Sequence, residues 1–354
     1  MSGSDAVHKA RELLMEATEV LQNSGVPSPK WDAEVLLGQV LGCGRGDLPF
    51  LLRGAALTGE QAGRFRALVG RRARREPLQH ICGSWDFMGL ELAVDRRALI
   101  PRPETEILVE TVVGWLQETG VCGGADGADG ADGADGAGGA VGAGGAANAP
   151  GSGGGAGDAD AADGGAGSPL AADVGTGTGA IALALAHFCP QLKILATDVS
   201  AEALDLAADN ARRLGLQGRV EFARGDLLEP VAAWLGQRHA QPTVDVGRAA
   251  TEGLAALVSN PPYIPSAEIA GLQPEVAGHD PRLALDGGPD GLVFYRRLVP
   301  GTFPLLRPGG LCAVEVGLGQ AQEVVSMFRD AGYTKVKVTN DLSGVERIVL
   351  GYRP

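Results

Sequence analysis

The chain has 354 residues, of which 45% are hydrophobic, so it is long enough to bury one or two ordinary cores. Its formal net charge is −13, but seven of the acidic residues lie in residues 123–167, which contain neither Lys nor Arg. The rest of the chain is therefore only mildly acidic, and net charge alone does not exclude any class of partner.

Targeting and redox signals are few. No apolar run approaches the roughly 18 residues of a membrane-spanning helix, and residues 1–20 mix acids with bases, so we expect no membrane span, secretion signal or transit peptide. The five cysteines show neither CxxC nor Cys/His spacing, which predicts no metal site, no disulfide framework and a reducing compartment. They are Cys43, Cys82, Cys122, Cys189 and Cys312.

Residues 1–76 are predicted to form a small helical domain. Apolar residues recur with helical spacing in three stretches, and the last stretch begins with Thr58 and Gln61 in a capping-box arrangement. The predicted helices cover residues 6–25, 29–42 and 57–76.

Residues 77–100 are predicted to form a β-hairpin linker that turns at Met88 and Gly89. A catalytic domain is expected over 101–354, beginning with a helix that has proline at its entrance and acids in its first turn. It is interrupted at about 121–168, where 19 of the 45 residues in 123–167 are Gly and most others are Ala or Asp. Such a composition cannot bury enough apolar area to offset its ordering entropy, which predicts a disordered insert.

From residue 168 onward, strand patterns alternate with helical patterns. This alternation predicts an α/β fold with a mostly parallel, doubly wound, Rossmann-like sheet, whose last two strands form an antiparallel C-terminal edge. Ligands of such sheets bind beyond the carboxyl ends of the strands.

The stretch "DVGTGTGA" joins the first of these strands to a helix and contains Gly175, Thr176, Gly177, Thr178 and Gly179. Glycines there permit a tight turn and let the backbone approach a ligand. Because the spacing is GxGxG rather than GxGxxG, a dinucleotide pyrophosphate site is less favoured. A plain tight turn remains the alternative.

Acidic residues end the next two strands. Asp198 lies about twenty residues beyond the glycines, where a carboxylate can accept both ribose hydroxyls of an adenosine, or can merely cap the following helix. Asp226 can accept from an adenine amine while Leu227 packs on the ring, although an acid at a strand end is also common turn chemistry.

The fourth strand ends in "VSNPPYIP", with Asn260, Pro261, Pro262 and Tyr263. Two prolines cannot extend a strand ladder, so the chain must turn and present an amide, free carbonyls and an aromatic face. The order of glycine turn, two strand-end acids and NPPY resembles the class I S-adenosylmethionine-dependent methyltransferases that alkylate planar nitrogens. The resemblance implies S-adenosylmethionine as cofactor and Asn260 at the border of the cofactor and substrate sites.

The stretch "REPLQHICGSWDFMGLELAVDRRALIPRPETE", with "DVGTGTGAIALALA" and "VSNPPYIP", resembles more closely the protein-(glutamine-N5) methyltransferases that modify peptide-chain release factors. This resemblance excludes 123–167. It implies the GGQ-loop glutamine of a class I release factor as substrate and a location in the bacterial cytoplasm or in a mitochondrion or plastid. The sequence leaves the oligomeric state open, and a monomer is the default expectation. It also places Arg102 and Glu104 beside the cofactor pocket, although they could simply shape a helix entrance.

A mechanism follows as a hypothesis. Asn260 and the Pro261 carbonyl accept the two N–H bonds of the glutamine amide, and Tyr263 stacks on the amide plane, so alignment replaces a strong general base.

Three rival functions remain. An adenine-N6 DNA methyltransferase shares the cofactor pocket and NPPY, but no target-recognition domain is evident and direct nucleic-acid binding is not expected. A non-catalytic cofactor-binding module and a nicotinamide dehydrogenase are disfavoured, the first by the intact NPPY and the second by the lack of an acid–base residue near the strand ends. Six arginines between residues 64 and 75 are either a solvated helix face or a surface for an acidic partner or RNA.

Overall fold

The structure is a computed structural model that describes residues 8–52, 56–122, 168–239 and 253–354. The predicted insert at 123–167 lies outside these residues. The chain divides into two units between Cys82 and Gly83. The predicted domain limits at residues 76 and 100 stay predictions.

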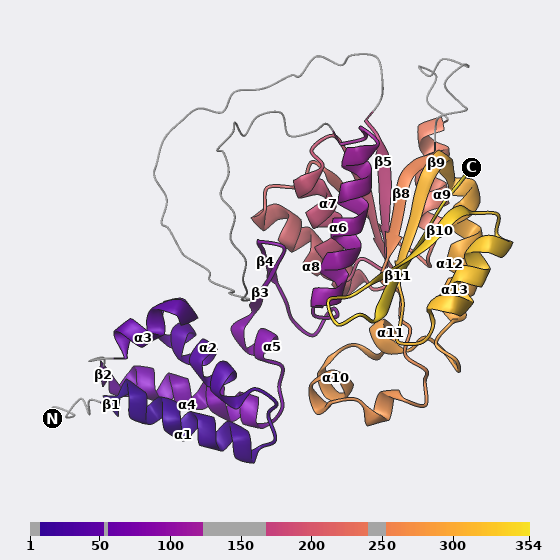
Figure 1. Ribbon diagram of the computed structural model, residues 1–354. Helices are drawn as coiled ribbons and strands as arrows, with labels where there is room; N and C mark the ends of the chain where they lie inside the picture. Colours follow the sequence, from indigo (N-terminus) through magenta and orange to yellow (C-terminus); the bar gives the residue numbers. More distant parts are fainter. Residues whose placement is uncertain (1–7, 53–55, 123–167, 240–252) are drawn as a thin grey trace, which may run out of the picture. The chain divides into compact units, whose positions relative to one another are not determined.

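The first unit is helical, as its apolar periodicity predicts (Figure 1). The Thr58 Oγ1 atom accepts a hydrogen bond from the Gln61 amide at 3.2 Å, and Gln61 Oε1 accepts one from the Thr58 amide at 3.0 Å, which confirms the capping box. The elements of this unit are β1 (His8–Lys9), α1 (Ala10–Asn23), α2 (Pro29–Leu41), η1 (Arg45–Asp47), α3 (Leu48–Leu51), β2 (Ala56–Leu57), α4 (Gly59–Ala73) and α5 (Leu78–Cys82).

The arginine run of this unit is divided between its interior and its surface. Arg72 is 5% exposed and donates to Asp32 Oδ2 at 2.6 Å, and Arg71 pairs with Glu76 at 2.6 Å. Arg64 and Arg74 are exposed. The six arginines therefore do not form one uniform face.

The second unit begins with the hairpin. Strands β3 (Ser84–Phe87) and β4 (Leu90–Ala93) pair antiparallel with Phe87 opposite Leu90, and Met88 and Gly89 both have positive φ. Two successive residues in that region form the turn whose twist matches a two-residue hairpin, which confirms the predicted turn.

A seven-stranded sheet forms the centre of the second unit, in the order β10-β11-β9-β8-β5-β6-β7. Strands β5 to β9 are parallel, whereas β11 lies antiparallel between β9 and β10, so the doubly wound sheet and its antiparallel edge are confirmed. The strands are β5 (Leu170–Val174), β6 (Lys193–Asp198), β7 (Val220–Arg224), β8 (Leu254–Ser259), β9 (Leu306–Glu315), β10 (Thr334–Asn340) and β11 (Glu346–Tyr352).

Helices cover both faces of this sheet (Figure 1). Helices α6, α7 and α8 pack on one face, and α9, α12 and α13 pack on the other, each face with its own buried apolar cluster. The helical elements of this unit are α6 (Pro103–Glu118), α7 (Ala180–Phe188), α8 (Ala201–Arg213), α9 (Glu229–His239), η3 (Ile269–Gly271), α10 (Pro274–His279), α11 (Arg282–Leu285), α12 (Val293–Thr302), η4 (Phe303–Leu305) and α13 (Ala321–Asp330). No helix in the described part of the chain has the length and apolarity needed to cross a bilayer.

One cysteine pair corrects the sequence analysis. Cys122 and Cys189 form a disulfide, although no spacing in the sequence indicated one. Cys122 follows α6 and Cys189 ends α7, and these helices pack side by side on the sheet, which brings together residues 67 apart in the sequence. Cys43, Cys82 and Cys312 are free.

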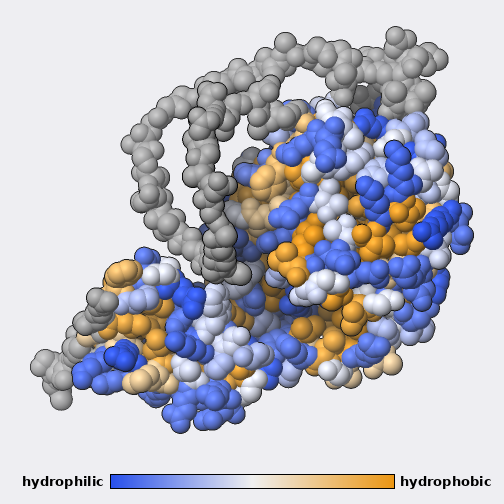
Figure 2. Space-filling view, viewed as in Figure 1, coloured by the Kyte–Doolittle hydropathy of each residue, from blue (hydrophilic) through white to orange (hydrophobic). Residues whose placement is uncertain are grey.

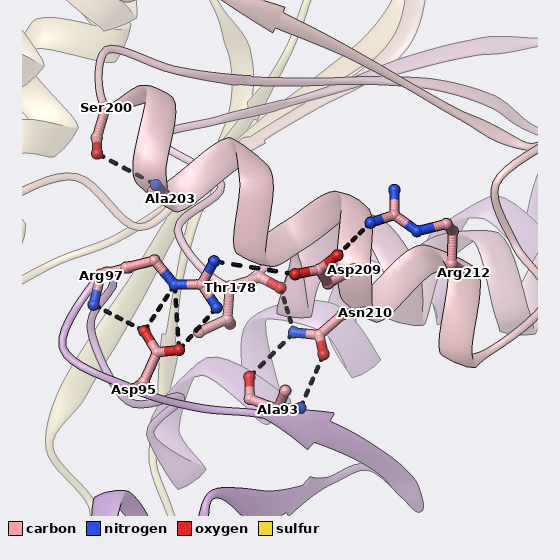
Figure 3. Close-up of polar contacts among 9 residues, drawn as sticks. All are labelled: Ala93, Asp95, Arg97, Thr178, Ser200, Ala203, Asp209, Asn210 and Arg212. Carbon is pink, nitrogen blue, oxygen red and sulfur yellow. Dashed lines mark hydrogen bonds and ion pairs between the residues drawn. The ribbon is translucent and has the colours of Figure 1, made fainter.

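Asn210 on α8 ties the end of the hairpin to the glycine turn (Figure 3). It is fully buried; its Oδ1 accepts from the Ala93 amide at 2.8 Å, and its Nδ2 donates to the carbonyls of Ala93 and Thr178 at 3.1 and 2.9 Å. Side-chain amides that satisfy three buried backbone groups are costly to remove, because each group is left without a partner.

The Asn210→Leu variant should therefore unfold more easily. It keeps the branched shape but is larger and leaves three backbone groups unpaired, and we expect a loss of about 3 kcal/mol or more in the free energy of unfolding. Urea denaturation followed by circular dichroism measures this loss, with the exposed Asn340→Leu as the matched control. Equal midpoints for the two variants would show that the Asn210 bonds add nothing.

Candidate active site

A pocket opens beyond the carboxyl ends of the parallel strands, where the strand order reverses between β5 and β8. This is where doubly wound sheets bind ligands. The predicted residues in its wall are Gly175, Thr176, Gly177, Thr178, Asp198, Asp226, Leu227, Asn260, Pro261 and Pro262. Gly179 and Tyr263 were also predicted site residues, but they do not line it.

The glycine turn fixes the floor of the pocket. The amides of Gly175 and Thr176 both donate to the Thr197 carbonyl at 2.9 Å, which joins the turn to β6. Gly175 and Gly177 have φ of 75° and 55°, and a Cβ on Gly175 would meet only open space. Gly179 serves packing instead, because a Cβ there would lie 3.1 Å from both Ala207 Cβ and Leu183 Cδ1.

Asp198 is held by backbone donors at the end of β6. Its Oδ2 accepts from the Gly177 amide at 3.0 Å and its Oδ1 from the Ser200 amide at 2.9 Å. The cap of α8 is Ser200, whose Oγ accepts from the Ala203 amide at 3.2 Å (Figure 3). Each carboxylate oxygen of Asp198 keeps a lone pair for a ligand hydroxyl, since an ionised carboxylate offers about four acceptor positions.

Asp226 and Leu227 lie side by side in the wall after β7. The Asp226 carboxylate forms an ion pair with Arg297 of α12, a partner that the sequence did not indicate. Both side chains are about half exposed, at 47% and 51%, and such pairs contribute little to stability. A ligand amine would therefore share Asp226 with Arg297.

The NPPY segment leaves β8 and crosses the same edge. Asn260 is partly buried, and its Nδ2 donates to Thr105 Oγ1 at 3.1 Å. Pro261 is buried. The Tyr263 hydroxyl lies 3.5 Å from Glu315 Oε1, and its carbonyl accepts from Gln320 Nε2 at 2.9 Å. Tyr263 thus packs behind the wall, and its predicted stacking on the substrate amide stays a prediction.

The segment between the hairpin and α6 supplies wall residues for which the sequence analysis gave no firm role. Arg102 lines the pocket and donates to Asp280 Oδ2 at 2.8 Å. Asp280 is 7% exposed, and burial raises its pKa to about 6, against the attraction of Arg102. Glu104 does not line the pocket, whereas Thr105, missed from sequence, does.

Asp173 is a fully buried acid beneath the glycine turn that sequence reasoning also missed. Its Oδ2 accepts from Thr176 Oγ1 at 2.5 Å and from the Ala182 amide at 3.1 Å, so it joins the turn to the first turn of α7. Burial raises its pKa to about 7, although these two hydrogen bonds lower it. An acid inside the apolar strand "LAADV" was the available signal.

No three His, Cys, Asp or Glu residues are grouped so as to hold a metal ion within residues 8–52, 56–122, 168–239 and 253–354.

Comparisons with known proteins cover both units. Residues 12–83 match the PrmC N-terminal domain and residues 171–236 match a methyltransferase domain. The chain is 38% identical over 97% of its length to a release factor glutamine methyltransferase of Moorella thermoacetica, covering 98% of that protein. It is 35% identical over 95% of its length to one of Caulobacter vibrioides, covering 94% of it, and 33% identical over 99% to one of Geobacter sulfurreducens, covering 99% of it.

The raised pKa of Asp173 makes stability depend on pH. In the unfolded chain the Asp173 carboxyl has a pKa of about 3.9. Between about pH 4 and pH 7 the folded chain therefore keeps a proton that the unfolded chain has released. The contribution of Asp173 is full below that window and is lost as pH rises through about 7.

Asp173→Asn cannot ionise. As the pH rises across this window, the unfolding free energy of the unchanged protein should fall by roughly 2–4 kcal/mol more than that of the variant. Urea unfolding at several pH values measures this difference, and the exposed Asp330→Asn is the control. Parallel stability curves for Asp173→Asn and the unchanged protein would contradict the assignment.

Proposed function

We propose that this chain, which belongs to the release factor glutamine methyltransferase family, transfers a methyl group from S-adenosylmethionine to the side-chain amide nitrogen of a release factor glutamine. The glutamine is that of the GGQ loop of a class I peptide-chain release factor. The observation that carries the proposal is that Asn260 and the glycine turn share one pocket. The protein acts as a monomer in the compartment of translation: the bacterial cytoplasm, or a mitochondrion or plastid.

The pocket residues fit the cofactor. Gly175 leaves open the space that a Cβ would fill, so a ligand can approach the backbone closely. Asp198 supplies carboxylate oxygens for the ribose hydroxyls, while Leu227 and Ile100 supply apolar walls for a flat ring. When bound, S-adenosylmethionine supplies an electrophilic methyl group on a sulfonium.

The residues of the NPPY segment hold the acceptor. A glutamine amide nitrogen is a weak nucleophile because its lone pair is delocalised into the carbonyl, so the pocket must orient it. Asn260 Oδ1 and the Pro261 carbonyl accept its two N–H bonds. Fixing the nitrogen in line with the methyl group contributes roughly 7–11 kcal/mol in favourable cases, and both acceptors present negative dipole ends to the charge developing on nitrogen.

The adenine-N6 DNA alternative would use the same pocket but needs a surface for phosphates. The arginine run is the strongest basic feature of the sequence, yet Arg72 and Arg71 are engaged with Asp32 and Glu76 within the first unit. A protein partner therefore fits this unit better than a duplex.

The first unit offers a surface for the release factor. Figure 2 shows hydrophobic side chains on the visible face of the first unit. Phe50 and Leu51 of α3 are 76% and 42% exposed. Exposed apolar patches mark interaction sites, and exposed arginines on α4 add charge for acidic groups on the partner.

The Asn260→Ala variant should lose methyl transfer while it keeps the cofactor. Removing the amide removes one acceptor for the substrate N–H, so we expect turnover to fall at least about 100-fold, with the dissociation constant for S-adenosylmethionine changed less than about threefold. Mass spectrometry of the release factor and calorimetry of the cofactor measure the two quantities.

The Asn340→Ala variant, with an exposed asparagine on β10, is the matched control. An active Asn260→Ala variant would refute this mechanism. If the unchanged protein instead methylated only an adenine-containing DNA duplex in a parallel reaction, the proposed substrate would be wrong.

Charge reversal on α4 and at the residue that follows it should weaken binding of the release factor. The double variant Arg64→Glu, Arg74→Glu changes two exposed arginines and should raise the KM for the release factor roughly tenfold while kcat stays the same. Initial rates over a range of release factor concentrations give both constants. Arg329→Glu, an exposed change on α13, is the control, and a KM equal to the control's would place the docking surface elsewhere.

A further inference from the structure

A chain of buried polar groups lies behind Asn260. Thr105 in the first turn of α6 and Glu315 at the end of β9 are 4% and 1% exposed. Thr105 Oγ1 donates to Glu315 Oε2 at 2.7 Å, and Asn260 Nδ2 lies 3.1 Å from Thr105 Oγ1. The segments that bear these three residues are far apart in sequence, and the three side chains meet at the carboxyl edge of the sheet.

The hydrogen bonds among these three side chains have a fixed direction. An ionised carboxylate only accepts hydrogen bonds, so the single hydroxyl hydrogen of Thr105 is used in the bond that it donates to Glu315. The Thr105 oxygen then has only lone pairs left for Asn260, and the group that faces it must be the Nδ2 donor. The opposite orientation of the amide would set Oδ1 against an oxygen with no proton to share.

We propose that Thr105 and Glu315 are positioning residues that fix the Asn260 amide so that its Oδ1 accepts from the N–H of the substrate glutamine. This inference rests on the proposed function. It assigns the selection of a substrate hydrogen-bond donor to two residues that act through Asn260.

The surroundings of Glu315 keep its charge state sensitive to pH. The groups that face it are Thr105 and Glu104 of α6, Tyr263 after β8, Tyr295 of α12 and Arg347 of β11. Burial first, and the charge of Glu104 to a smaller extent, raise the pKa of Glu315 to about 7, against the Thr105 hydrogen bond, Arg347 and Tyr263, which lower it. Below that pH the carboxyl carries its own proton and no longer forces Thr105 to donate toward it.

The first test compares Thr105→Val with Thr105→Ser. Valine keeps the shape but removes the hydroxyl, so we expect kcat for release factor methylation to fall about 10- to 100-fold, with the dissociation constant for S-adenosylmethionine unchanged. Serine restores the hydroxyl and should recover most of the lost kcat. Thr111→Val on the same helix, whose hydroxyl bonds only to the Ile107 carbonyl among the described residues, is the matched control.

The second test is the pH profile of kcat. The unchanged protein should lose kcat as pH falls below about 7, whereas Glu315→Gln should have a lower kcat and a smaller acidic limb, because Asp173 and Asp280, whose pKa values are about 7 and about 6, are unchanged in it. This measurement is independent of whether Thr105→Val folds. If Glu315 had only a structural role, its replacement would lower kcat without changing the acidic part of the pH profile.

The outcomes separate the two proposals. Unchanged kcat in Thr105→Val, or a pH profile of Glu315→Gln that matches that of the unchanged protein, overturns the positioning role while methylation by the unchanged protein upholds the proposed function. An unchanged protein that binds S-adenosylmethionine but leaves the release factor unmethylated overturns both.

Discussion

The parallel register of three neighbouring strands is the constraint on which the site depends. Asp173 of β5 lies opposite Val258 of β8, which lies opposite Ala313 of β9, so the three strands end at one edge. The glycine turn, Asn260 and Glu315 follow or end these strands within a few residues. A shift of one residue in any pairing would turn a buried side chain to the other face and move Asn260 or Glu315 away from the pocket.

Local signals predicted the parts of the site that are contiguous in sequence. Glycines at positive φ, an acid at the end of β6 and a proline pair after a buried strand each have a physical meaning within a few residues, and the structure brings them into one wall. Gly179 and Tyr263 do not line the pocket, because a motif specifies the path of the backbone more closely than the direction of each side chain.

Long-range contacts set the limit of the sequence analysis. Thr105 and Glu315 are separated by 210 residues, and Cys122 and Cys189 by 67, so no periodicity or spacing connects them. Asp173 was closer to prediction, because a buried acid in an apolar strand needs partners. The fold itself was predictable, since alternating strand and helix patterns leave few ways to cover both faces of a sheet.

Helix α6 runs from the pocket to the opposite edge of the sheet, so the junction that follows it lies far from the pocket. Its first turn holds Thr105 beside the pocket, and its sixteen residues carry the backbone about 24 Å to the amino edge of the sheet. The chain leaves that edge at Cys122 and re-enters it directly before β5 at residue 168. Evolution can therefore lengthen this junction without disturbing the reacting atoms, and a protein engineer who wants to graft a fluorescent reporter onto the enzyme has the same freedom there.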